Sequence, residues 1–189
     1  MSSSAGKPHL GHGTGGPPHN ARPAPLVESP AARVVWAIAR LSLGWVFVWA
    51  FLDKAFGLGH ETPAAKAWIN GGSPTEGFLK SATKGPLASA YQGMAGAVWA
   101  DWLFMIGLAA AGVALMLGIG MRIAAVAGTV LLVMMWSAVL PPENNVFMDY
   151  RLIYAILLIG LALVRAGDTL GLGRWWERTA LVRRCPVLK

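Results

Sequence analysis

Apolar and polar positions divide this chain into long apolar stretches joined by polar ones. Four stretches are apolar enough to enter a bilayer, and they cover residues 34–56, 102–121, 123–140 and 146–165. A helix needs about 20 residues to cross the roughly 30 Å of hydrocarbon in a membrane, because each residue adds about 1.5 Å. The pattern therefore predicts an all-α polytopic membrane protein, a bundle of four transmembrane helices.

The fourth stretch is the shortest. Its charge-free part has thirteen residues, 152–164, which reach roughly 20 Å along a helix. Arg151 and Arg165 flank this part and can extend their head groups to the two interfaces, and Val146–Phe147 can lengthen the apolar run upstream. A buried helix of a soluble protein would look similar, but the three longer spans beside it favour a fourth crossing.

The connection between the first two spans, residues 57–98, carries helix signals of its own. Thr62–Pro63 opens one expected helix, which Gly71–Gly72 closes. The run Ser73-Pro74-Thr75-Glu76 has the pattern of a capping box with proline at the first helical position, and this second helix should end at Gly85–Pro86. Four apolar residues, Trp68, Ile69, Phe78 and Leu79, indicate that both helices lie on the membrane or cover the bundle.

Composition changes at both ends of the chain. Residues 1–30 hold five Gly and six Pro with few apolar side chains, which is typical of a segment that cannot offset the entropy of ordering. We interpret them as a disordered cytoplasmic tail. Residues 31–165 form the predicted transmembrane domain, and residues 166–189 form a basic cytoplasmic tail.

The charges support a membrane protein and predict its orientation. Charged residues make up 13% of the chain, against about 25% in soluble domains. The net charge of +7 could indicate nucleic-acid binding, but Lys and Arg collect beside the spans, so we expect no nucleic-acid partner. Of the 16 basic residues, 11 lie on the side of both termini. Because cytoplasmic flanks carry the excess of Lys and Arg, we predict a bacterial plasma membrane protein with both termini cytoplasmic.

Small residues at helical spacing predict where helices touch in the bilayer. Gly107, Ala111, Ala114 and Gly118 repeat along the second span, and Ala124 with Gly128 does so on the third. In lipid, such residues allow close backbone approach between helices. The stripe Met134, Met135 and Trp136 could line a quinone pocket, although packing against lipid or a neighbouring helix is the simpler interpretation.

Ionisable residues at membrane depth are costly and are therefore candidate functional groups. Arg40 lies inside the first span, either as an anchor at the interface or as a ligand for an anionic head group or substrate. The others lie at the outer helix ends, where a compact bundle brings them together: Asp53, Lys54, Asp101, Asp149 and Arg151. Such a ring could hold a small anion, relay protons to a quinone, or tie the helix ends together.

Several motifs in this order resemble the DoxX/DoxD family of small four-helix membrane proteins. They are RLSLGWVF from Arg40 with the pair Asp53–Lys54, WINGGSP from Trp68, DYRLIYA from Asp149 and GLGRWW from Gly171. The resemblance covers about residues 33–180. For the DoxD branch it implies a membrane subunit of thiosulfate:quinone oxidoreductase, which passes electrons from thiosulfate to the quinone pool.

The resemblance implies a quinone as the cofactor, with no group bound covalently, and a second protein subunit, because this chain has no flavin motif, one cysteine and no histidine in its spans. We expect no metal site, and a homo-oligomer is a further option. One alternative is a non-catalytic membrane anchor or scaffold that recruits soluble redox or stress proteins through its tails. Another is a small-solute transporter, although the inverted repeats usual for that class are missing.

Overall fold

The computed structural model describes residues 27–188, and every regular element in that part of the chain is helical. This confirms the predicted all-α class for the described residues. The long helices are α1 Pro30–Phe56, α4 Val98–Leu117, α5 Met121–Ala138 and α6 Tyr150–Leu163. The short elements are η1 Ala64–Lys66, η2 Trp68–Asn70, α2 Glu76–Ser81, η3 Gly85–Leu87, α3 Ala88–Gln92, η4 Ala166–Asp168, α7 Gly173–Trp176, α8 Ala180–Arg184 and η5 Pro186–Leu188.

Three of the long helices, α1, α4 and α5, are long and apolar enough to cross a membrane. The fourth, α6, is apolar as well but has 14 residues. Large apolar side chains point outward along these helices, and Ile106, Val126 and Ile156 are each more than half exposed. Such surfaces suit contact with lipid, so the helices are consistent with an integral membrane protein.

Local caps move several helix ends away from the predicted boundaries. Ser29 caps α1, so that helix begins at Pro30 and includes the last residue assigned to the tail. The second span was predicted over 102–121, but α4 covers Val98–Leu117, because Gly118 takes a positive φ of 72° and ends the helix. The third was predicted over 123–140, whereas α5 covers Met121–Ala138.

The helix α6 begins later than the predicted span, at Tyr150 rather than at residue 146, and is therefore shorter. Asp149 caps this helix, its side chain accepting the backbone N–H of Arg151 at 2.8 Å. The helix therefore begins at Tyr150. The apolar pair Val146–Phe147, predicted to lengthen the span, lies outside the helix and is exposed.

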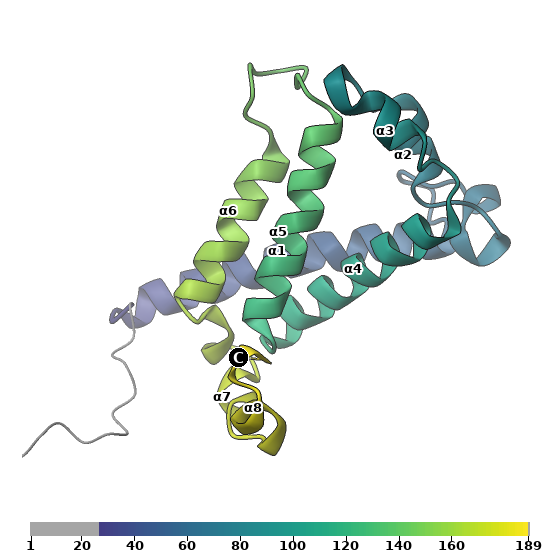
Figure 1. Ribbon diagram of the computed structural model, residues 1–189. Helices are drawn as coiled ribbons and strands as arrows, with labels where there is room; N and C mark the ends of the chain where they lie inside the picture. Colours follow the sequence, from purple (N-terminus) through teal and green to yellow (C-terminus); the bar gives the residue numbers. More distant parts are fainter. Residues whose placement is uncertain (1–26, 189) are drawn as a thin grey trace, which may run out of the picture.

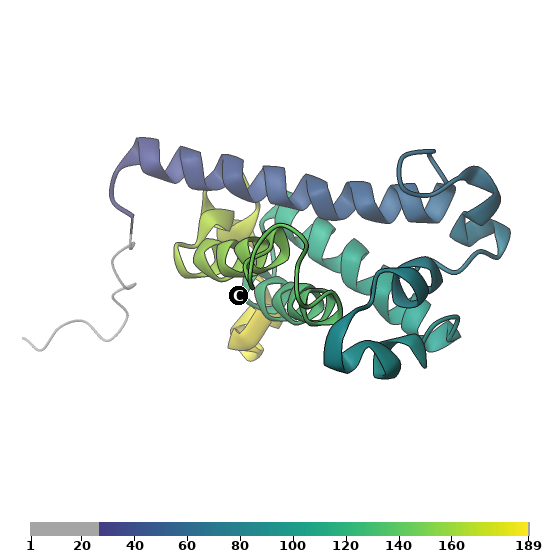
Figure 2. The ribbon, with the colours of Figure 1, turned by 90° about the horizontal axis from the view of Figure 1, so that it is seen from above.

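The long helices form two antiparallel pairs. α1 packs along α4, and α5 packs along α6, while α4 and α5 meet near their shared turn and then diverge (Figure 1). From above, α1 is seen lengthwise and α5 and α6 nearly end on, so the pairs cross steeply (Figure 2). Because α4 and α5 diverge from their shared turn, they form a V, and residues 57–97 lie at its open side. We call the end that carries them the loop end and the opposite end, near residues 118–120, the terminal end.

Close helix contacts occur at small residues, partly at those the spacing indicated. Gly128 is buried on α5, where an added methyl group would meet Leu158 of α6. On α4, however, the tightest position is Gly112, where that methyl group would lie 2.9 Å from the backbone N of Val48. At Gly107, which the spacing had indicated, an added methyl group would lie 3.7 Å from its nearest neighbour, Leu131 Cδ1, so the contact there is an ordinary one. Gly112 therefore sets the approach of α1 to α4.

The segment between α1 and α4 is helical only in short pieces. Instead of one helix after Thr62–Pro63, the structure has the two 3₁₀ turns η1 and η2. The Ser73 hydroxyl accepts the N–H of Glu76 at 3.2 Å, as a capping serine does, and α2 then ends at Ser81 rather than at Gly85–Pro86. The location of these pieces at a membrane surface stays a prediction.

Candidate functional site

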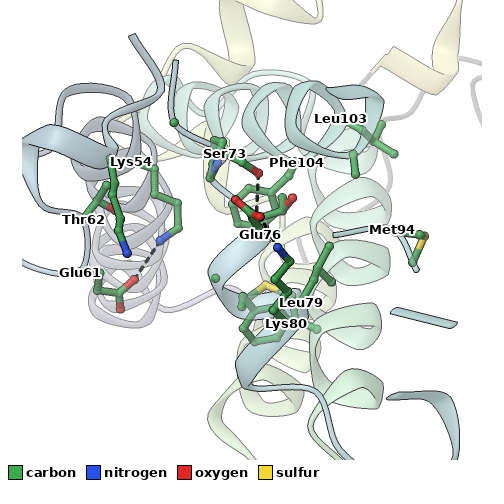
Figure 3. Close-up of a pocket in the computed structure, with 18 of the residues that line it drawn as sticks. Lys54, Glu61, Thr62, Ser73, Glu76, Leu79, Lys80, Met94, Leu103 and Phe104 are labelled. Carbon is green, nitrogen blue, oxygen red and sulfur yellow. Dashed lines mark hydrogen bonds and ion pairs between the residues drawn. The ribbon is translucent and has the colours of Figure 1, made fainter. Parts of the chain in front are cut away.

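A cavity of about 1060 Å³ opens at the loop end, between the diverging helices and residues 57–97. Figure 3 shows part of its lining, which comes from the end of α1, from α4 and α5, from the loop and from the start of α6. Its apolar wall includes Phe78, Leu79, Met94, Trp99, Leu103, Phe104, Leu131, Met134 and Met135. Its polar lining includes Lys54, Glu61, Lys66, Ser73, Thr75, Glu76, Lys80, Tyr91 and Arg151. The cavity is therefore amphipathic.

Two lysines of this lining are paired with glutamates. Lys54 Nζ lies 3.1 Å from Glu61 Oε2, and Lys80 Nζ lies 2.5 Å from Glu76 Oε1 (Figure 3). The Lys54 side chain is 17% exposed, whereas its glutamate is 79% exposed. An anionic ligand could replace a solvent-facing glutamate of this kind at little cost, because exposed ion pairs contribute at most about 1 kcal/mol.

Arg151 is the most enclosed cation of the cavity. Its side chain is 13% exposed, and Nη1 donates to Asp149 Oδ2 at 2.9 Å. The guanidinium carbon lies 4.5 Å from the centre of the Tyr150 ring and 5.8 Å from that of Phe78. Its Nε is buried and has no hydrogen-bond partner among residues 27–188. Arg151 thus keeps one free donor beside two aromatic rings.

The three candidate aspartates hold the local structure. Asp53 accepts the backbone N–H groups of His60 and Glu61 at 3.2 and 3.1 Å, which closes the turn after α1. Asp101 accepts from Ser73 Oγ at 2.9 Å and from Thr75 N and Oγ1 at 3.1 and 2.6 Å. Asp149 caps α6. The Thr75 groups held by Asp101 are buried, so this carboxylate satisfies donors that would otherwise lack a partner.

Arg40 lies at the terminal end, away from the other candidates, and its side chain is fully buried. Nη1 donates to the carbonyls of Leu115 and Met116 at 2.5 and 3.2 Å, and Nη2 to those of Leu170 and Thr169 at 2.7 and 3.4 Å. The last carbonyls of a helix have no partner within the helix. Arg40 satisfies two of these in α4 and joins them to the chain after α6.

The predicted ring of charge at the loop end is therefore divided in two. Lys54 and Arg151 line the cavity, whereas Asp53, Asp101 and Asp149 hold the elements that surround it. Of the stripe considered for a quinone pocket, Met134 and Met135 line the cavity. Trp136 does not, and its Nε1–H donates to the Phe147 carbonyl at 2.7 Å instead.

Sequence reasoning missed the contribution of Tyr91. Its hydroxyl lies 2.7 Å from Ser137 Oγ and joins α3 to the end of α5. No signal within either segment could have shown this, because 46 residues separate them.

Lys84 makes a second connection between the loop and the end of α5, at the protein surface. The backbone N–H of Lys84 donates to the Ala138 carbonyl at 2.8 Å, and Lys84 Nζ lies 2.7 Å from Glu143 Oε1. This hydrogen bond from Lys84 lowers the pKa of the Glu143 carboxyl below its ordinary value. Because both side chains are exposed, the backbone contact is the more durable of the two.

No family model, no curated protein and no solved structure matches this chain. The site must therefore be interpreted from its own geometry. An amphipathic cavity with a largely enclosed arginine, aromatic rings and methionines suits a molecule with a planar, hydrogen-bond-accepting head and an apolar body.

Proposed function

We propose that this chain is a four-span integral membrane protein of the DoxX/DoxD type whose loop-end cavity binds a quinone. In this role it serves as the membrane subunit of a thiosulfate:quinone oxidoreductase. The observation that carries the proposal is the amphipathic cavity of about 1060 Å³, with Arg151 between aromatic rings and a wall that includes Met134 and Met135.

The fourth crossing is supported by the surroundings of α6. This helix runs along α5, and its 14 residues reach roughly 21 Å. Ion pairs flank it on both sides, Arg151 with Asp149 at one end and Arg165 with Glu177 at the other. Paired charges at the two ends allow a short helix to sit in a locally thinned bilayer. An even number of crossings then leaves both termini on the cytoplasmic side, where most Lys and Arg lie.

The cavity offers complementary groups for each part of a quinone. The ring carries two carbonyl acceptors, and the guanidinium of Arg151, which lines the cavity, is the candidate donor for one of them. The rings of Tyr150 and Phe78 lie beside that guanidinium and could stack on the quinone. The methionines of α5 provide an adaptable apolar wall for the first part of the tail.

Thiosulfate oxidation requires a second subunit in this proposal. Joining two thiosulfates through a new S–S bond releases two electrons, and the quinone takes up these electrons with two protons to become a quinol. The partner would carry the sulfur chemistry, while the side chains of this chain bind and orient the quinone. Glu61, which is 79% exposed beside Lys54, is placed to exchange protons with water.

Calorimetric titration of the purified full-length protein with decylubiquinone tests the binding site. We expect saturable binding, and the substitution Leu103→Trp should weaken it roughly tenfold or more, because the larger side chain occupies the cavity. Ile106→Trp is the matched control, because Ile106 lies on the same helix and is exposed to a similar degree, 57% against 63% for Leu103, but is not part of the cavity lining. Absence of saturable binding, or equal weakening by both substitutions, would contradict a quinone site here.

The redox reaction needs a separate measurement. Membranes from cells with the gene should reduce quinone faster on addition of thiosulfate than membranes from cells without it. Equal rates, together with intact decylubiquinone binding, would leave a quinone-binding protein with a different electron donor.

A further inference from the structure

The chain after α6 is fixed to the terminal end of the bundle. The Leu172 N–H donates to the Leu117 carbonyl at 2.8 Å, and Arg40 donates to the carbonyls of Thr169 and Leu170. Within the segment, Trp176 Nε1 donates to the Leu188 carbonyl at 2.6 Å. Figure 1 shows α7 and α8 beyond the turn where α4 and α5 meet. The segment therefore has a defined place at one end of the apolar helices.

The segment after α6 carries four arginines within residues 174–184. Arg174, Arg178, Arg183 and Arg184 are all exposed, and none has an ion pair or side-chain hydrogen bond with another residue of 27–188. The acids nearby, Asp168 and Glu177, both contact Arg165. These four exposed arginines lie within residues 174–184, and no acid of the described chain pairs with them.

Apolar side chains are exposed among these arginines. Trp175 of α7 is 63% exposed and Leu181 of α8 is 54% exposed, although Val182 beside it is fully buried. In water such exposure is unfavourable, whereas tryptophan prefers the boundary between head groups and hydrocarbon. We call the four arginines with Trp175 and Leu181 the C-terminal basic surface.

We propose that the C-terminal basic surface binds the phosphate head groups of anionic phospholipids, with Trp175 and Leu181 inserted between them. Charge complementarity supports this occupant, because arginines pair with phosphate oxygens through two parallel donors. The exposed Trp175 and Leu181 favour a lipid surface over an acidic protein, and the segment adjoins the ends of apolar helices. The proposal does not depend on quinone binding.

The single cysteine provides a probe for the test. Cys185 is exposed and directly follows Arg184, so a fluorescent NBD group attached there reports the polarity around the surface. The full-length labelled protein is placed in nanodiscs of phosphatidylcholine with or without phosphatidylglycerol, whose two open faces make the orientation irrelevant. We expect phosphatidylglycerol to shift the emission to the blue, and high salt to reverse the shift, because salt screens charge at this distance.

Charge substitutions decide between electrostatic binding and simple proximity. Each arginine near an anionic surface contributes roughly a fivefold gain in affinity, so R183Q/R184Q should weaken the affinity for phosphatidylglycerol roughly 25-fold and strongly reduce the blue shift. R183K/R184K should keep most of it, and K80Q/K84Q, which removes two charges at the loop end, should leave it unchanged. Equal emission with and without phosphatidylglycerol, or an unchanged response in R183Q/R184Q, would overturn the proposal. A shift produced by poly-glutamate but not by the anionic lipid would overturn it in favour of an acidic protein partner.

Discussion

Replacement of Arg40 by methionine should lower the free energy of unfolding by about 2–6 kcal/mol, because its two shortest-bonded carbonyls lose their donor at a cost of about 1–3 kcal/mol each. The methionine fills similar space but donates no hydrogen bond, so the carbonyls of Leu115 and Leu170 lose the donors that lie 2.5 and 2.7 Å away. In thermal unfolding of the purified protein, this loss corresponds to a fall in Tm of roughly 10 °C. The Tm of Arg40→Lys should lie between those of the unaltered protein and Arg40→Met, because a single ammonium group cannot reach all four carbonyls.

A matched control separates this effect from a general loss of positive charge. Arg122 also lies at the terminal end, but it is exposed and has no side-chain partner in the described chain. Arg122→Met should therefore change stability by less than about 0.5 kcal/mol. If Arg40→Met melts like the unaltered protein, Arg40 does not hold the helix ends, and the head-group-binding interpretation from the sequence would become the better one.

Replacement of Asp101 by alanine should release the loop from α4. The Asp101 carboxylate accepts from the Ser73 hydroxyl and from both the backbone and the hydroxyl of Thr75, and hydrogen bonds to a charged group contribute about 1.5–3 kcal/mol. A loss of about 2 kcal/mol in the local opening free energy corresponds to roughly thirtyfold faster cleavage of the loop by trypsin, which can cut after its lysines. Gel analysis of timed digests measures this rate.

Two variants show whether the Asp101 carboxylate itself protects the loop from cleavage. Asp101→Asn keeps an oxygen that can accept the same hydrogen bonds, so its loop should be cut at a rate between those of the unaltered protein and the alanine variant. Glu76→Ala removes a glutamate whose lysine contact is exposed, and cleavage should change little. Similar acceleration by Asp101→Ala and Glu76→Ala would mean that Asp101 has no special role in holding the loop.

The sequence predicted the fold class because long apolar stretches have few alternatives in a membrane. Helix ends were predicted less well, since they depend on single residues such as the Gly118 cap with its positive φ and the Asp149 cap. These local signals were present in the sequence. By contrast, spacing alone could not show that α4 approaches α1 through Gly112, because α4 is apolar on all sides and carries several small residues.

The candidate site was predicted in composition but not in arrangement. Residue type and depth singled out Arg40, Arg151 and Asp101, which all prove to be largely buried. Their partners could not be predicted, because Arg40 contacts carbonyls 75 and 130 positions away and Asp101 contacts hydroxyls 26 and 28 positions away. The cavity itself depends on the divergence of α4 from α5, which follows from tertiary packing and has no pattern of its own in the sequence.

Labelling of Cys185 in intact bacterial cells with a membrane-impermeant maleimide tests the central claim, a chain that crosses the membrane four times. Cys185 is exposed and is the single cysteine, so the unaltered protein can be used directly. We expect no labelling until the cells are permeabilised, whereas Ser89→Cys in a Cys185→Ser background, with its thiol on the exposed loop, should be labelled at once. Labelling of both Cys185 and Ser89→Cys in intact cells would place the end of the chain on the same side as the loop and show that α6 does not cross.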